Sequence, residues 1–111
     1  MGSRRPTAIF VASDIQAIGA LAALQDSDLR CPDDVALVGF DDIMLASSLG
    51  LTTMRQPMYE MGSLAVERLM IRMQDPVQPP VNMTFTPKLV IRRTCGSHVA
   101  LQSSKVIYSE A

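Results

Sequence analysis

Apolar residues in the first half of the chain form two short uninterrupted runs with a helical stripe between them. Residues 8–12 read AIFVA and residues 35–40 read VALVGF. Runs of this length, rich in β-forming residues, predict strands that are buried on both faces, as in a parallel sheet. From Ile15 to Leu24 the apolar positions follow the helical period instead. The order strand, helix, strand predicts a βαβ unit with a right-handed crossover.

The middle of the chain predicts a short helix, an extended segment and a long helix. The short helix is expected over 44–49, with Gly50 as its natural stop. Residues 51–56 read as extended chain, and Pro57 suits the first turn of a helix over 57–73. The apolar face of that helix is predicted to hold Met58, Met61, Gly62, Ala65, Leu69 and Met73.

A proline-rich loop and one more strand complete the pattern. The loop covers residues 76–83, and residues 84–94 predict a final strand in which Pro87 favours an edge position or a bend. The eight methionines mostly follow helical spacing, so we expect them to fill the core. Residues 1–5 are predicted to be a disordered start, and residues 97–111 a flexible tail.

Composition indicates a single globular domain without a basic surface. The 111 residues are 48% hydrophobic and 19% charged, with a net charge of −1 at pH 7. Arg4-Arg5 and Arg92-Arg93 are the only basic pairs, whereas a nucleic-acid-binding domain carries a basic face or stripe. We therefore expect any DNA contact to come from another segment. Cys31 and Cys95 stand outside any C-x-x-C motif and are expected to be free thiols in a reducing cytosol.

The sequence predicts neither a signal peptide nor a membrane span. The apolar stretch that follows Arg4-Arg5 is interrupted by Asp14 and Gln16. No stretch approaches the roughly 20 apolar residues that a spanning helix requires. The protein is therefore expected to be cytoplasmic, with no membrane partner.

Candidate chemistry lies at the C-terminal ends of the two predicted strands. Ser13-Asp14 follows the first run and Asp41-Asp42 follows the second. In open α/β sheets, ligands bind in the crevice beyond these strand ends. A carboxylate there accepts hydrogen bonds from neighbouring hydroxyls, which suits a polyhydroxylated ligand such as a sugar. The alternative interpretation is structural, because acids after strands often serve as helix caps.

Catalytic and cofactor motifs are absent from the sequence. It contains no phosphate-binding P-loop, no dinucleotide-binding glycine motif and no G-x-S-x-G nucleophile elbow. The single histidine, His98, falls in the predicted tail, and together with Cys95 it supplies too few ligands for a zinc site. We therefore predict a protein that is not an enzyme and that has no cofactor and no metal site.

Several segments, in the right order, resemble the motifs of one known family. Residues 6–14, PTAIFVASD, and residues 17–24, AIGALAAL, resemble PTAIFAAND and ALGALRAL of the LacI/GalR (lactose-repressor) family of transcriptional regulators. Residues 29–42, LRCPDDVALVGFDD, are similar to its GLRVPDDVSVVGFDD. Residues 51–57, LTTMRQP, match its LTTVRQP, and residues 89–93, LVIRR, match its closing strand.

This resemblance implies an α/β fold, namely part of a periplasmic-binding-protein-like (type I) fold. That fold has two subdomains around a ligand cleft, linked by hinge strands. Residues 6–96 would be the C-terminal part of the effector domain, with 6–50 in one subdomain. The chain would cross a hinge near 51–56, place the helix at 57–73 in the other subdomain and return through the strand at 84–94. The family's DNA-binding helix-turn-helix and the first half of the cleft match nothing in this chain.

The resemblance also carries site residues and partners. Asp41 matches the family's acceptor for sugar hydroxyls, Gln56 matches a hinge residue near the pocket, and Ser13 stands where the family has Asn or Asp. With Asp14, these are the predicted ligand-binding residues. The implied function is a ligand-sensing fragment of a regulator with a sugar effector, a homodimeric partner and DNA contacts through a helix-turn-helix elsewhere. The alternative is a fragment of a periplasmic-type sugar-binding transport protein.

Overall fold

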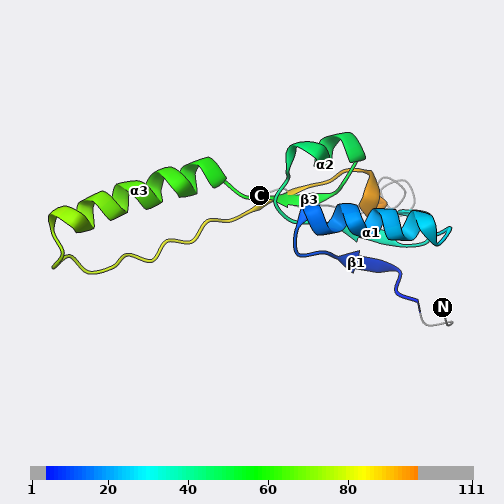
Figure 1. Cartoon of the computed structure of the whole chain (residues 1–111), viewed down its shortest axis with the longest axis horizontal. Helices are drawn as coiled ribbons and strands as arrows, with labels where there is room; N and C mark the ends of the chain where they lie inside the picture. The colour runs from blue at the N-terminus through cyan, green and yellow to red at the C-terminus, as the bar shows by residue number, and fades with distance from the viewer. Residues whose placement is uncertain (1–4, 98–111) are drawn as a thin grey trace.

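The computed structural model describes residues 5–97 and divides into an α/β body and a projecting arm (Figure 1). We define the body as residues 5–56 and 88–97, and the arm as residues 57–87. The predictions of a disordered start and a flexible tail fall largely on residues 1–4 and 98–111, which lie outside the described residues. Ser97, the first residue of the predicted tail, is buried with 4% of its surface exposed.

The body begins with the predicted βαβ unit. Strand β1 (Ala8–Phe10) and strand β2 (Ala36–Val38) pair in parallel, with Ala8 opposite Ala36 and Phe10 opposite Val38. Helix α1 (Asp14–Asp26) connects them. Ser13 is its N-cap, as expected, because its hydroxyl accepts a hydrogen bond from the backbone N–H of Gln16 at 3.2 Å. The parallel strand pair confirms the predicted fold class.

The prediction that both strands are buried on both faces is wrong. Phe10 of β1 is 65% exposed, whereas Leu37 of β2 is fully buried. Among the described residues, β1 has a neighbouring strand on one edge only. An uninterrupted apolar run indicates a strand, but burial of that strand depends on other segments that pack on its two faces. The described residues supply such segments for β2 more completely than for β1.

The body continues with a second pair of strands. Helix α2 (Met44–Leu49) has the predicted bounds and ends at Gly50, which adopts the left-handed conformation with φ of 67°. Strand β3 (Thr53–Arg55) then pairs antiparallel with strand β4 (Lys88–Val90). Isolated bridges from Val38 to Thr52 and from Asp41 to Arg55 place β3 beside β2. The strands therefore lie in the order β1, β2, β3, β4.

The last strand is much shorter than the predicted 84–94. Its partner β3 has only three residues, so the ladder ends where β3 ends. Residues on the N-terminal side, including Pro87, follow the arm without strand pairing, and Arg93–Cys95 turn into a 3₁₀ helix, η1. The proline therefore marks the end of the ladder, in agreement with its missing N–H donor.

The core of the body is small and contains both apolar and polar side chains. Its apolar part consists of Ala17, Leu37, Ala46 and Leu51, all fully buried. A hydroxyl network lies beside it, in which the Thr94 hydroxyl donates to the Leu37 carbonyl at 2.8 Å and accepts from the Thr52 N–H at 2.9 Å. These bonds attach the chain after β4 to β2 and β3, as buried polar groups require.

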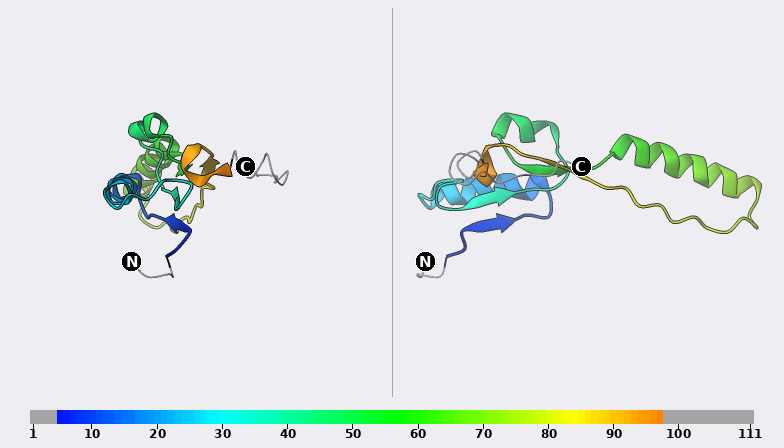
Figure 2. Two further views of the ribbon diagram at one scale, coloured as in Figure 1. Left: turned by 90° about the vertical axis from the view of Figure 1, so that its right-hand side faces the viewer. Right: turned by 180° about the vertical axis from the view of Figure 1, so that it is seen from behind.

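The arm consists of helix α3 (Met58–Gln74) and the extended return that follows it. The helix was predicted correctly, but none of its residues is buried. The Cα radius of gyration is 18.7 Å, whereas a compact chain of this length has about 13 Å. Figure 2 shows the arm extending away from the body in a view from behind.

The prediction that methionines fill the core is wrong for most of those described. Met73 in the arm is 73% exposed and Met44 on α2 is 96% exposed. Helical spacing of apolar residues correctly indicated one face of a helix. It did not indicate whether this chain supplies a surface for that face to pack on.

Candidate functional site

Asp14, predicted as a ligand contact, is instead part of the internal structure of the body. Its side chain has no exposed surface. One carboxylate oxygen, Oδ1, accepts from the Thr53 hydroxyl at 2.7 Å, and the other, Oδ2, accepts from the Ile43 N–H at 3.0 Å. Gly39 lies against this carboxylate, since a Cβ at that position would overlap Oδ1. Asp14 thus joins α1, α2 and β3, and the structure corrects its predicted contact with a ligand.

Ser13 lies next to Asp14 and is used as the cap of α1. Besides accepting from the Gln16 N–H, its hydroxyl donates to the side-chain oxygen of Gln16 at 3.3 Å. It is partly exposed, but it is not among the residues that line the cavity described next. The structure therefore does not bring Ser13 to the cavity that Asp41 and Gln56 line.

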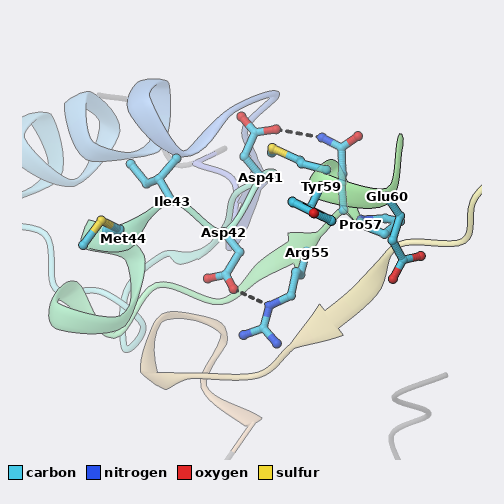
Figure 3. Close-up of a pocket in the computed structure, with 10 residues that line it drawn as sticks. Asp41, Asp42, Ile43, Met44, Arg55, Pro57, Tyr59 and Glu60 are labelled. Atoms are coloured by element: carbon cyan, nitrogen blue, oxygen red, sulfur yellow. Dashed lines mark hydrogen bonds and ion pairs between the residues drawn. The ribbon is translucent and has the colours of Figure 1, made fainter. Parts of the chain in front are cut away.

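Asp41 and Gln56, in contrast, are brought together. The Gln56 side-chain amide donates to Oδ1 of Asp41 at 2.9 Å, as the upper dashed line in Figure 3 shows. Both residues line a cavity of about 640 Å³ at the junction of body and arm. This volume falls within the roughly 300–1,000 Å³ of small-molecule sites. The remaining lining residues are Asp42, Ile43, Met44, Arg55, Pro57, Met58, Tyr59 and Glu60.

The two aspartates form an unusual turn after β2. Asp41 has φ of 127° and Asp42 has φ of 59°, both in the region that favours glycine. Such conformations cost on the order of 1–3 kcal/mol each and persist where the surroundings fix them. Here the Asp41 N–H donates to the Met54 carbonyl at 2.8 Å. The turn therefore directs successive side chains in different directions, with Asp41 toward Gln56 and Asp42 toward Arg55 (Figure 3).

Asp42 is held by two arginines that the sequence did not assign to the site. Its Oδ2 pairs with Arg55 at 2.6 Å, and its Oδ1 pairs with Arg92 at 2.9 Å. The Arg92 side chain is 17% exposed and that of Asp42 is 9% exposed, so the second pair is largely shielded from water. In the sequence, Arg92 stands in a basic pair and at the end of the matched segment LVIRR, but it was not predicted as a site residue. Its position at the end of a matched motif was the one signal available.

These contacts set the protonation of Asp42. Burial acts to raise the pKa of the Asp42 carboxyl, but the hydrogen bonds from Arg55 and Arg92 outweigh burial and leave the pKa below its ordinary value. Asp42 is therefore a carboxylate at neutral pH. Both of its oxygens are engaged by guanidinium groups, whereas the Asp41 carboxylate accepts one hydrogen bond, from the Gln56 amide.

Cys31 directly precedes Pro32, and Cys95 is the last residue of η1. Both are free thiols, as predicted. Burial raises the pKa of the Cys31 thiol. Burial also acts to raise the pKa of Cys95, but hydrogen bonds involving Ser97 and Thr52 lower it below its ordinary value. Neither thiol lines the cavity at Asp41.

Within residues 5–97, no group of three or more His, Cys, Asp or Glu side chains is arranged to hold a metal ion. No helix in that same range has the length and apolar character to cross a membrane. The cavity instead offers three carboxylates, an amide and a partly exposed arginine beside the side chains of Ile43, Met44 and Tyr59. This is a set of hydrogen-bonding and apolar groups suited to binding a polar small molecule.

Comparisons with known proteins support this assignment of fold and family. Residues 1–95 match the family model of the periplasmic binding protein-like domain. The ribose operon repressor of Haemophilus influenzae is 43% identical over 97 residues, covering 86% of this chain and 29% of that protein. The HTH-type transcriptional repressor PurR of Escherichia coli is 38% identical over 94 residues, covering 83% of this chain and 28% of that protein.

A solved structure of the transcriptional regulator CelR with cellobiose superposes with a TM-score of 0.75 and 33% identity, over 79% of this chain and 28% of that one. The chain therefore belongs to the periplasmic binding protein-like domain family, on the branch formed by the effector domains of LacI/GalR regulators. It spans less than a third of the length of the curated relatives that it matches.

Proposed function

We propose that the cavity at Asp41 is part of the effector site of a LacI/GalR transcriptional regulator and that its effector is a sugar. The regulator would act in the cytoplasm as a homodimer, and it would contact DNA through a helix-turn-helix outside these 111 residues. The chain would have no catalytic activity of its own. The names of its relatives favour this function over transport, because they are transcriptional repressors.

The pairing of Asp41 with Gln56 carries the proposal. The Asp41 carboxylate is half-buried at the cavity and accepts one hydrogen bond, from the Gln56 amide. A carboxylate has further lone pairs, so acceptor sites remain for the hydroxyl groups of a ligand. The side-chain oxygen of Gln56 is an acceptor as well, and both groups therefore suit a ligand rich in hydroxyl donors.

The surface around α1 and α2 supports the homodimer. Ile15 is 65% exposed, Met44 is 96% exposed and Leu45 is 54% exposed. Contiguous exposed apolar surface commonly marks a protein interface, and Met44 and Leu45 are adjacent at the start of α2.

The test uses a chimaera in which residues 6–95 replace the matching segment of the Haemophilus influenzae ribose operon repressor. Calorimetric titration with D-ribose, other pentoses, hexoses and cellobiose measures which sugar binds. We expect Asp41→Ala to weaken binding of the best sugar about 10- to 100-fold, because a charge-assisted hydrogen bond contributes roughly 1.5–3 kcal/mol. Asp33→Ala is the matched control, since Asp33 is a surface aspartate away from the cavity, with a side chain 61% exposed.

The outcomes separate the parts of the proposal. A folded chimaera that binds none of the sugars contradicts the assignment of a sugar effector. Equal affinities of the parent and the Asp41→Ala variant remove Asp41 from the site and leave the family assignment intact.

A further inference from the structure

Two arginines from different parts of the chain form ion pairs with the Asp42 carboxylate, one with each oxygen. Arg55 belongs to β3, which leads out to the arm, and Arg92 follows β4, which returns from it. Their nitrogen atoms lie 2.6 Å and 2.9 Å from the two carboxylate oxygens. Each oxygen of Asp42 is therefore fixed separately, which prevents the carboxylate from rotating.

The same carboxylate is attached to a turn that would not form readily by itself. Neither Asp41 nor Asp42 is a glycine, yet both have positive φ. The backbone N–H of Asp41 is held firmly by the Met54 carbonyl. The backbone N–H of Asp42 is held only weakly, because it lies 3.4 Å from the Thr53 hydroxyl. The side-chain ion pairs of Asp42 are the strongest contacts that act directly on the second residue of the turn.

We propose that Arg92, acting through Asp42, is a positioning residue for the Asp41 carboxylate. The inference rests on the proposed function of Asp41 as the effector contact. Arg92 keeps Asp42 in the left-handed conformation, and that conformation directs the Asp41 side chain toward Gln56 and the cavity. Arg92 itself does not line the cavity.

Arg92 is better suited to this task than Arg55 because it is already ordered. Its backbone N–H donates to the Thr52 hydroxyl at 2.9 Å, and its guanidinium donates to the Leu51 carbonyl at 2.9 Å. The Arg55 side chain is 55% exposed, so water and salt screen its pair with Asp42. We expect removal of the Arg92 guanidinium to disturb the turn more than removal of the Arg55 guanidinium.

The test compares the 111-residue chain with its Arg92→Met variant by NMR, at concentrations where sedimentation shows a monomer. The readouts are the three-bond HN–Hα couplings and the Cα and Cβ shifts of Asp41 and Asp42, which report φ. Arg93→Met is the matched control, because neighbouring Arg93 donates to the Cys31 and Leu49 carbonyls instead of to Asp42. We expect the positive-φ signature to be lost in Arg92→Met and kept in Arg93→Met, while Ala17 in α1 keeps its shifts in both.

A conservative variant covers the case in which Arg92→Met does not fold. Arg92→Lys keeps the charge but cannot serve both Asp42 and the Leu51 carbonyl in the same geometry. We expect it to shift the Asp41 and Asp42 signals more than Arg93→Lys does. Unchanged signals in a folded Arg92→Met variant, or equal shifts in the two lysine variants, overturn the proposal.

The chimaera separates this inference from the proposed function. We expect Arg92→Met to weaken sugar binding there about tenfold, the order found when outer partners that orient a ligating side chain are removed from metal sites. If the turn changes but the affinity does not, Asp41 is not the effector contact and the positioning role stands. If the affinity falls while the turn is intact, the positioning role is wrong.

Discussion

Helices α1 and α3 have similar apolar content but opposite environments. In the body, α1 has the Ser13 cap at its start and buries Ala17 and Leu24. In the arm, α3 has no side-chain cap and buries no residue. The difference shows that a periodic pattern specifies a helix, whereas burial depends on which other segments are present to cover it.

The two helices differ because helix formation depends on local hydrogen bonds, whereas burial depends on contacts with segments distant in the sequence. The hydrogen bonds of a helix are local, and a helix of 17 residues such as α3 exceeds the roughly 12–15 residues below which isolated helices are marginal. Most helical stability in proteins nevertheless comes from packing an apolar face. The described arm lacks most of that packing, and three perturbations test the contrast with the body.

The largest expected effect is on association. The arm exposes Leu69 by 59% and Met73 by 73%, on a helix that has no buried residue. Exposed apolar patches drive association, so we expect the mass of the 111-residue chain in analytical ultracentrifugation to rise with concentration. The double change Leu69→Glu with Met73→Glu should reduce this rise in mass, because it removes the apolar face of the arm and leaves the surface around α1 and α2 unchanged.

Gln74→Glu provides the control for this experiment, because it adds a negative charge at the end of the same helix without removing an apolar side chain. We expect this variant to associate like the parent chain. A parent chain that stays monomeric at every concentration would show that the exposed face of the arm does not drive association.

A matched pair of leucine truncations gives the next largest effect. Leu37 in β2 is fully buried, and Leu37→Ala should cost about 2–5 kcal/mol of unfolding free energy, because it leaves a cavity in a small core. Leu69→Ala in the arm should change the unfolding free energy by less than about 0.5 kcal/mol when the chain is monomeric. Urea denaturation at low protein concentration measures both, and similar losses would contradict the division into a packed body and an unpacked arm.

The smallest expected effect is the pH dependence of the ion pairs at Asp42. In the folded chain the pKa of Asp42 lies below its ordinary value of 3.8. As the pH falls, the Asp42 carboxylate is therefore protonated in the unfolded chain before it is protonated in the folded chain. The associated stability is complete above the ordinary pKa and is lost as the pH falls through the lower pKa of the folded state. We expect Asp42→Asn to reduce the loss of unfolding free energy between pH 7 and pH 3.

Asp34 offers a comparison within the same experiment. Backbone and side-chain hydrogen bonds from Arg30 lower the pKa of Asp34, but its side chain is 24% exposed, against 9% for Asp42, and the Arg30 side chain is 74% exposed. Solvent screening is stronger at such a surface pair, so Asp34→Asn should alter the pH dependence less than Asp42→Asn. A larger effect at Asp34 would contradict this order.

Local signals in the sequence predicted those parts of the fold that depend on neighbouring residues. Ser13 caps α1, Gly50 ends α2, and the bounds of α2 agree with the expectation. Strand lengths were overestimated, because β4 extends only as far as β3 accompanies it. The number of paired residues is a property of two distant segments, and no pattern within residues 84–94 contains it.

The candidate site shows the same limit. Asp41 and Gln56 were each predicted as ligand-binding residues, and in the structure a hydrogen bond joins them. The sequence did not indicate that Thr53 and Ile43 would donate hydrogen bonds to the carboxylate of Asp14. It also did not indicate the ion pair between Arg92 and Asp42. Each of these partners comes from another element, so its identity depends on the packing of the body.

The two crossings between body and arm have a mechanical consequence. The chain leaves the body at Gln56-Pro57 and re-enters it at Pro87-Lys88, next to the terminal pair of the β3–β4 ladder, Arg55 and Lys88. A rigid piece that is tethered at two points can swing only about the line that joins them, and a proline ring restricts φ at both points. Rigid motion of the arm is thereby reduced to a single axis. Because Asp41 belongs to the body and Tyr59 to the arm, and both line the cavity, each swing would change the distance across the cavity.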